Sequence, residues 1–169
     1  MKLGSIEDVY AEQLGSLRSA ELQLVEALPK LAAAASDKKL KQAFNQHLAE
    51  TEVHRERLDQ VIAASASPVP EVTCEAMRGL LGEGEKVIGA AGPDAVKDVA
   101  LIAVAQCVEH YEIAMYGTAR ALADQLDQRD ARELLSETLD EESRADELLT
   151  KLATGGLIVS GINERAQDE

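Results

Sequence analysis

Four segments of the chain carry apolar residues at the three- and four-residue spacing of an amphipathic helix. They run from residue 5 to about 35, from 36 to about 64, from 94 to about 126 and from about 127 to 154. Ser5 and Asp37 are typical helix N-caps, and Gly155 is typical of the position after a helix C-terminus. The pattern predicts four long helices that bury their apolar faces together.

The lengths of the connections predict how these helices are arranged. The connection at Ser36 and Asp37 is short, so we expect the first two helices to be antiparallel. Residues 65–92 form a much longer connection, rich in Gly and Pro, with a weak helical pattern over 73–91. A connection of this length can cross from one end of a bundle to the other, which makes the second and third helices parallel. The sequence therefore predicts an all-α four-helix bundle with a long crossover that carries a short extra helix.

We expect residues 1–156 to form this one bundle domain and residues 157–169 to form a C-terminal tail. The tail is expected to fray or to supply a contact between subunits. Composition agrees with a folded helical domain, because 46% of the residues are hydrophobic and Trp is absent, with only three Tyr and one Phe.

Charge and hydropathy argue against several classes of partner. The formal net charge is −14, whereas nucleic acids and anionic membranes are bound by clustered Lys and Arg. The longest apolar run, Val99–Ala105, is far shorter than the roughly 20 residues of a membrane span. The N-terminus has no pattern of a secretory signal, and Cys74 and Cys107 have no spacing of a zinc site or a redox dithiol. We expect a cytoplasmic protein with reduced thiols and without nucleic-acid or membrane partners.

Acidic residues or histidines interrupt all four apolar faces near mid-length. A single carboxylate in an apolar interior costs several kcal/mol unless it is neutralised, paired or bound to a metal. Several such groups that meet inside one bundle need a cation. The candidate metal ligands are Glu21, His47, Glu50, His54, Glu109, Glu112, Glu142 and Asp146.

Carboxylate and imidazole ligands suit iron, manganese and zinc. Di-iron sites in four-helix bundles use one Glu from each of two helices and a Glu-x-x-His pair from each of the others. This chain differs, because Glu50 and His54 are four residues apart and the fourth helix offers Glu142 and Asp146 without a histidine. We expect two transition-metal ions, with iron as the first choice and manganese or zinc as alternatives. Whether His47 or His54 is the ligand stays open at this stage.

Each candidate also has an explanation without a metal. Glutamates usually lie on solvated helix faces, and a lone histidine on an apolar face is more often an ordinary core residue. The alternative function is therefore a metal-free dimeric bundle with a structural or adaptor role, in which buried acids pair with Arg57 or Arg120. Mineral storage ranks third, because a shell needs further interfaces. The coincidence of acids on all four helices favours the metal site.

Short motifs across nearly the whole chain resemble those of the bacterial YciE/YciF-like proteins of the ferritin superfamily. The motifs are Ile6-Glu-Asp-Val, His47-Leu-Ala-Glu-Thr, Cys74-Glu-Ala-Met, Val108-Glu-His-Tyr-Glu-Ile-Ala and Thr138-Leu-Asp-Glu-Glu. The resemblance implies a ferritin-like bundle, usually a homodimer, that is associated with stress responses and holds a di-metal centre.

The same resemblance carries ligand roles over to matching positions of this chain. His54 stands where glutamine is expected in such proteins, and Asp146 matches an acid. We expect the metals to react with O2 or peroxide, as in a ferroxidase or a detoxifying enzyme, with Tyr111 or Tyr116 as an electron donor or hydrogen-bond partner. Whether the protein is an enzyme stays open. The ligands implied by motif matches are Glu21, His47, Glu50, Glu109, Glu112 and Glu142.

Overall fold

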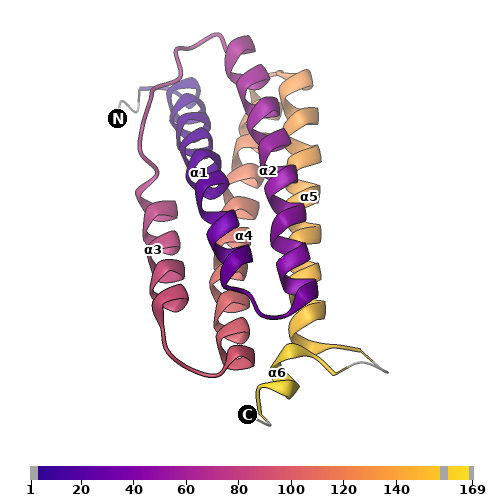
Figure 1. Ribbon diagram of the computed structural model, residues 1–169. Helices are drawn as coiled ribbons and strands as arrows, with labels where there is room; N and C mark the ends of the chain where they lie inside the picture. Colours follow the sequence, from indigo (N-terminus) through magenta and orange to yellow (C-terminus); the bar gives the residue numbers. More distant parts are fainter. Residues whose placement is uncertain (1–3, 157–159, 168–169) are drawn as a thin grey trace.

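Four long helices lie side by side and a fifth, shorter helix covers their flank (Figure 1). The computed structural model describes residues 4–156 and 160–167, and six helices occur in this part of the chain. The helices are α1 (Ile6–Ala34), α2 (Lys38–Ala64), α3 (Glu75–Gly89), α4 (Asp94–Gln125), α5 (Arg129–Thr154) and α6 (Ile162–Arg165).

The chain direction agrees with the predicted topology. α1 and α2 form an antiparallel hairpin, and the segment that contains α3 returns the chain to the end of the bundle where α2 began (Figure 1). α4 therefore runs parallel to α2, and α5 runs back beside it. The all-α bundle with a long crossover is confirmed, and the crossover carries one helix, α3.

Local chemistry sets the helix ends near the predicted positions. The Ser5 hydroxyl accepts a hydrogen bond from the Asp8 amide, and the Asp37 carboxylate accepts from the amides of Lys39 and Leu40 at 2.8 and 3.0 Å. Gly155 follows α5 with a φ of 72°, a conformation that favours glycine.

One buried acid, Asp98 on α4, fastens the α1–α2 turn to the third long helix. Its carboxylate accepts hydrogen bonds from the Ser36 amide at 2.9 Å, the Ser36 hydroxyl at 2.6 Å and the Asp37 amide at 2.8 Å. Three hydrogen bonds to one carboxylate compensate for its burial. The sequence pattern did not indicate this role, because the partners lie about 60 residues away in the chain.

The bundle core consists of two apolar clusters, one toward each end. The first contains Leu24, Leu28 and Leu31 of α1 with residues of α2, α4 and α5, and the second contains Leu14 and Leu17 of α1 with other residues of the same helices. Between the clusters lies the level of the interrupting acids and histidines. The polar groups are therefore enclosed by apolar layers along the bundle axis.

The short helix α6 packs back against the bundle. Ile162 is 1% exposed and belongs to the first apolar cluster, and the Arg165 guanidinium lies 2.8 Å from the Asp37 carboxylate. The expected tail includes residues 157–159 and 168–169, which lie outside the described residues. Among the described helices, none combines the length and apolar character needed to cross a membrane.

Replacing Gly15 with alanine is expected to destabilise the fold by about 2 kcal/mol or more, because the crossover backbone approaches α1 at this residue. A Cβ atom on Gly15 would lie 2.4 Å from the Pro70 carbonyl oxygen. Gly79→Ala on α3 is the control, since nothing lies within 4 Å of its Cβ position. That change should stabilise α3 by up to about 1 kcal/mol through helix propensity. Urea denaturation measures both, and equal effects would contradict the close approach.

Candidate metal centre

Six of the eight candidate ligands converge at one level of the bundle. Glu21 comes from α1, His47 and His54 from α2, Glu109 and Glu112 from α4, and Glu142 from α5. Helical spacing explains the convergence on each helix: Glu109 and Glu112 are three residues apart, and His47 and His54 are two turns apart. All six residues are 5% exposed or less.

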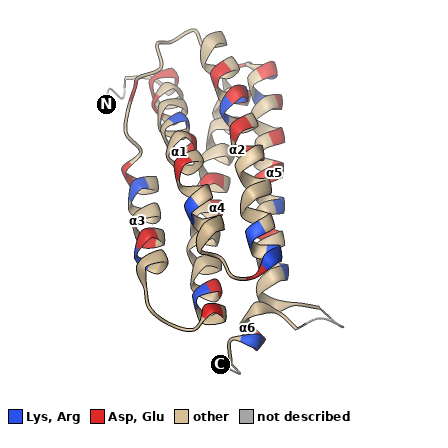
Figure 2. Cartoon of the chain, in the orientation of Figure 1, with Lys and Arg blue, Asp and Glu red and all other residues tan. Residues whose placement is uncertain are grey.

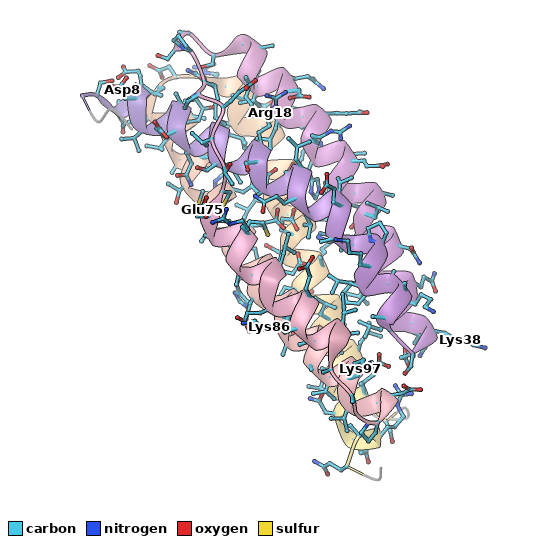
Figure 3. All side chains as sticks on the ribbon, turned by 60° about the vertical axis from the view of Figure 1, so that its left-hand side comes forward. Asp8, Arg18, Lys38, Glu75, Lys86 and Lys97 are labelled. Atoms are coloured by element: carbon cyan, nitrogen blue, oxygen red, sulfur yellow. The ribbon has the colours of Figure 1, made fainter. Side chains whose placement is uncertain are left out.

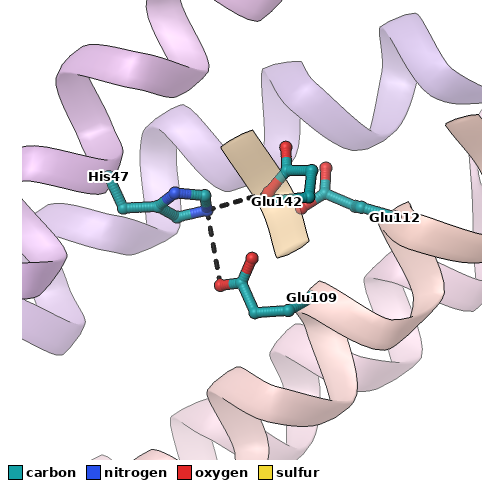
Figure 4. Close-up of side chains that lie close together, drawn as sticks. All are labelled: His47, Glu109, Glu112 and Glu142. Carbon is teal, nitrogen blue, oxygen red and sulfur yellow. Dashed lines mark ion pairs between the residues drawn. The ribbon is translucent and has the colours of Figure 1, made fainter. Parts of the chain in front are cut away.

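The six residues form two groups with one member in common. The ligand atoms of His47, Glu109, Glu112 and Glu142 all lie within 4.8 Å of one another, and so do those of Glu21, His54 and Glu142 (Figure 4 shows the first group). Glu142 belongs to both groups. Glu142 Oε2 faces His47 of the first group and Glu142 Oε1 faces His54 of the second, so this carboxylate could offer one oxygen to each group.

Both histidines face the shared carboxylate. His47 Nε2 lies 3.4 Å from Glu109 Oε1 and 3.7 Å from Glu142 Oε2 (Figure 4). His54 Nδ1 lies 2.9 Å from Glu142 Oε1 and 3.7 Å from Glu21 Oε1. The structure thus gives each histidine its own group, and the two imidazoles need not compete for a single position.

Many polar atoms of these side chains are buried without a hydrogen-bond partner, which is costly unless another group compensates. Such buried atoms are rare in folded proteins, and here they are oxygen and nitrogen atoms of the kinds that bind iron, manganese and zinc. The residues therefore fit a pair of transition-metal ions. The atoms are Glu21 Oε2, Glu109 Oε2, both oxygens of Glu112 and of Glu142, both nitrogens of His47, and His54 Nδ1.

Protons balance the charges of the cluster when no metal is present. Burial raises the pKa of Glu21 to about 7, and it raises the pKa values of Glu109 and Glu112 well above the ordinary range of a carboxyl group. Burial alone would also raise the pKa of Glu142, but the two nearby imidazoles hold it below its ordinary value. Among the four clustered acids, the fold thus favours the ionised form most at Glu142, and it favours proton binding at Glu21, Glu109 and Glu112.

The His47 imidazole also contributes to the charge balance of the cluster. Burial disfavours its charged form, but the negative charges of Glu109 and Glu142 raise its pKa to about 10. Because metal ligation requires a neutral imidazole and ionised carboxylates, metal uptake must release several protons from this cluster.

A carboxylate outside the two groups orients His54. His54 Nε2 lies 2.9 Å from Glu141 Oε2, and Glu141 also receives hydrogen bonds from both terminal nitrogens of Arg57. An imidazole whose Nε2–H donates to a carboxylate presents its Nδ1 lone pair on the opposite side. The Arg57–Glu141 pair therefore holds His54 with Nδ1 toward Glu142. The spacing of the sequence did not indicate this role for Glu141, because His54 lies 87 residues away in the chain.

The two tyrosines have different surroundings. The Tyr116 hydroxyl is buried and donates a short hydrogen bond to Glu21 Oε1, so it lies at the site. The Tyr111 hydroxyl lies 2.9 Å from Cys74 Sγ, its hydrogen-bond partner. A hydrogen-bonding role at the site is thus placed on Tyr116.

Glu50 and Asp146 lie at the edge of the cluster, outside both groups. The Glu50 side chain is 34% exposed; Oε2 lies 3.7 Å from His47 Nδ1 and Oε1 accepts a hydrogen bond from Gln46. Asp146 accepts a hydrogen bond from Gln106 Nε2 at 3.0 Å. Ligation by either residue stays a prediction. Helical spacing correctly predicted that both residues lie on the sides of α2 and α5 that face the cluster. It could not distinguish a residue at the centre of that side from one at its edge.

Replacing Glu141 with glutamine is expected to weaken metal binding by about 10- to 100-fold while preserving the fold, because His54 loses its orienting carboxylate. Glu137→Gln is a matched control. Glu137 also pairs with Arg57, at 3.4 Å from its Nε, but no ion pair between Glu137 and His54 occurs among the described residues. Isothermal titration with Mn(II) measures both affinities. Equal effects of the two variants would show that His54 orientation is not the cause.

Comparison with known proteins identifies the family of this bundle. The sequence model of a family described as a domain of unknown function, DUF892, matches residues 5–167. The chain belongs to the DUF892 family. Among DUF892 relatives, Escherichia coli (strain K12) protein YciF is 46% identical over 170 residues, which cover 100% of this chain and 99% of YciF. The resemblance seen in the sequence motifs is confirmed.

Two solved structures share this helical bundle. The crystal structure of the E. coli stress protein YciF superposes with a TM-score of 0.86 at 49% identity, covering 89% of this chain and 95% of YciF. YcfI from Rhodopseudomonas palustris, described as a proposed structural protein, superposes with a TM-score of 0.85 at 38% identity, covering 90% and 97% of the two chains. The descriptions of these relatives differ, so the site itself must carry the functional argument.

Proposed function

We propose that this DUF892 protein is a cytoplasmic ferritin-like protein with a di-metal carboxylate site that reacts with O2 or peroxide in a stress response. The observation that carries the proposal is the pair of buried ligand groups that share Glu142. Iron is the first choice of metal, and manganese or zinc are alternatives, because the ligand set contains two imidazoles and several carboxylates.

The residues divide into distinct roles under this proposal. His47, Glu109 and Glu112 would hold one ion, Glu21 and His54 the other, and Glu142 would join the two. A redox-active metal pair would supply electrons for the reduction of O2 or peroxide. The Tyr116 hydroxyl keeps Glu21 in place through its hydrogen bond, and the apolar layers on either side of the site limit access of bulk water.

The alternative is a metal-free dimeric bundle with a structural or adaptor role, which the description of the R. palustris relative favours. In that case the buried acids would need partners such as Arg57. Arg57 instead pairs with Glu141 and Glu137, at the edge of the cluster, and Arg120 is exposed on α4. The clustered acids are thus left to protons or metal ions, which favours the di-metal proposal.

We also propose that the protein forms a homodimer and has no nucleic-acid or membrane partner. Homodimer formation rests on the resemblance to the YciE/YciF-like proteins. Figure 2 shows acidic and basic residues interspersed along the helices, and with the net charge of −14 this supports a protein without a nucleic-acid or membrane partner.

Titration of metal-free protein with Fe(II) under anaerobic conditions, or with Mn(II), is expected to load about two ions per chain, as in other four-helix di-metal sites. Elemental analysis after desalting measures the stoichiometry. Protein purified without chelators or nickel columns provides the comparison for native occupancy. Retention of less than about 0.2 ions per chain would contradict the proposal, since buried ligand groups bind metals tightly.

A further inference from the structure

The apolar layers that enclose the cluster raise the question of how an ion reaches it. On α2 the site residues lie between Phe44 of the first cluster and Leu58 of the second, and the same order holds on the other long helices. A hydrated cation cannot pass through an apolar layer without a large desolvation cost. Entry must therefore occur from the side of the bundle.

A cavity of about 190 Å³ provides such a lateral opening between α2 and α5. His47 and Glu109, both members of the first ligand group, line this cavity. The other lining residues include Phe44 and Leu149, which are apolar, and Glu50, whose side chain is 34% exposed. The volume is sufficient for several water molecules, and hence for a partly hydrated ion.

Glu50 lies between solvent and the buried ligands. One of its oxygens is hydrogen-bonded to Gln46, and the other lies 3.7 Å from His47 Nδ1, on the side of the imidazole opposite the Nε2 that faces Glu109 and Glu142. This arrangement differs from that of Glu141, which binds the other histidine at 2.9 Å and is held by Arg57. Glu50 therefore belongs to neither ligand group. It also does not fix the orientation of His47 in the way that Glu141 fixes that of His54.

We propose that the cavity between α2 and α5 is the route by which divalent metal ions enter the site, and that Glu50 is a temporary carboxylate ligand on this route. The inference rests on the proposed di-metal function and assigns Glu50 a role in the rate of loading. Glu50 would offer the first carboxylate oxygen to an entering ion at the rim of the cavity, and His47 and Glu109 would then hold it at the floor. Arg144 also lines the cavity, is exposed and opposes the approach of a cation.

Kinetics separates a residue on the entry route from a ligand. A group that an ion meets only in passing changes the association and dissociation rates by the same factor and leaves Kd unchanged, whereas a final ligand changes Kd. Stopped-flow mixing of metal-free protein with Co(II), followed with a metallochromic indicator, gives the association rate. Transfer of Co(II) from loaded protein to EDTA gives the dissociation rate.

Glu50→Gln is expected to slow both rates by about 5- to 10-fold and to leave Kd and stoichiometry within about two-fold of the wild type. Arg144→Gln should accelerate both rates. The matched charge control is Glu52→Gln, an exposed residue of the same helix that does not line the cavity, and it should change the rates by less than about two-fold.

A second pair of variants tests the route without changing charge. Ala145→Leu fills the cavity and should slow loading and release equally, whereas Ala27→Leu fills a different cavity, between α1 and α3, and should have no effect on the rates. If both Glu50→Gln and Ala145→Leu keep the wild-type rates, the cavity is not the entry route, while the proposed di-metal site stands. Loss of one ion in Glu50→Gln would overturn it by making Glu50 a ligand. Failure of the wild type to bind any ion would instead overturn the proposed function.

Discussion

Replacing Glu142 with glutamine is expected to weaken binding at both metal positions by about 100-fold or more. Loss of a residue that only hydrogen-bonds to a metal ligand typically costs 10- to 100-fold in affinity, and Glu142 is itself a member of both ligand groups. The amide preserves the shape of the side chain but offers a single oxygen and no charge, so it cannot bridge two cations. Elemental analysis and isothermal titration should show a loss at both positions, whereas a change at Glu112 should affect mainly the first group.

Asp146→Asn is the matched control for this experiment. Asp146 lies one turn further along α5, carries the same charge and is hydrogen-bonded to Gln106 outside both groups. Its replacement should leave the stoichiometry unchanged. Circular dichroism establishes that both variants fold. If Glu142→Gln keeps two ions at wild-type affinity, the shared-carboxylate arrangement is wrong, whereas loss of an ion in Asp146→Asn would make Asp146 a ligand as well.

Metal removal is expected to make the stability of the protein depend strongly on pH between about 8 and 5. The pKa of Glu21 rises from 4.5 in the unfolded chain to about 7 in the fold, so the folded state binds more protons in this range. Lowering the pH therefore stabilises the metal-free protein. The raised pKa of His47 acts in the same direction, because its stabilising contribution is complete below about 6.5 and disappears as the pH rises toward 10.

The loaded protein should respond differently, because metal ions replace the protons of the cluster. The difference in Tm between loaded and metal-free protein should therefore grow as the pH rises. For Glu21 alone the raised pKa corresponds to about 3 kcal/mol, or roughly 6–12 °C in the Tm of a chain of this size. Below about pH 4.5 the metal-free protein should lose stability again, since the pKa values of Glu141 and Glu142 are lowered in the fold.

Calorimetry of metal-free and loaded protein at several pH values tests this expectation. Glu21→Gln should flatten the pH dependence of the metal-free form, and Glu26→Gln, an exposed position on the same helix, should leave it unchanged. Identical melting curves for loaded and metal-free protein across the whole range would support the metal-free bundle instead.

The sequence indicated only weakly the short helix α3 on the flank of the bundle. Four glycines lower the helix propensity of residues 79–89, yet α3 forms there and places Met77 and Gly84 against the bundle. Figure 3 shows the labelled Glu75 and Lys86 of this helix, both of which are exposed. Burial of one apolar side against α1 and α4 thus compensates for poor propensity, an effect that only tertiary contacts provide.

The sequence by itself determined the number of long helices, their approximate ends and their directions. Apolar spacing identifies the buried face of each helix, capping residues such as Ser5 and Asp37 identify the starts, and connection length separates the antiparallel hairpin from the parallel crossover. It also determined that acids and histidines meet inside the bundle, because they interrupt all four apolar faces at similar depth.

Only the tertiary structure decided which of these residues share a position. The rotation of each helix about its axis and its register against its neighbours depend on side-chain packing, which spacing along one helix does not contain. A small rotation of α2 or α5 separates a central ligand atom from one at the rim. Packing therefore places Glu142 between two histidines, leaves Glu50 and Asp146 at the edge, and brings Glu141 to His54 across 87 residues of sequence.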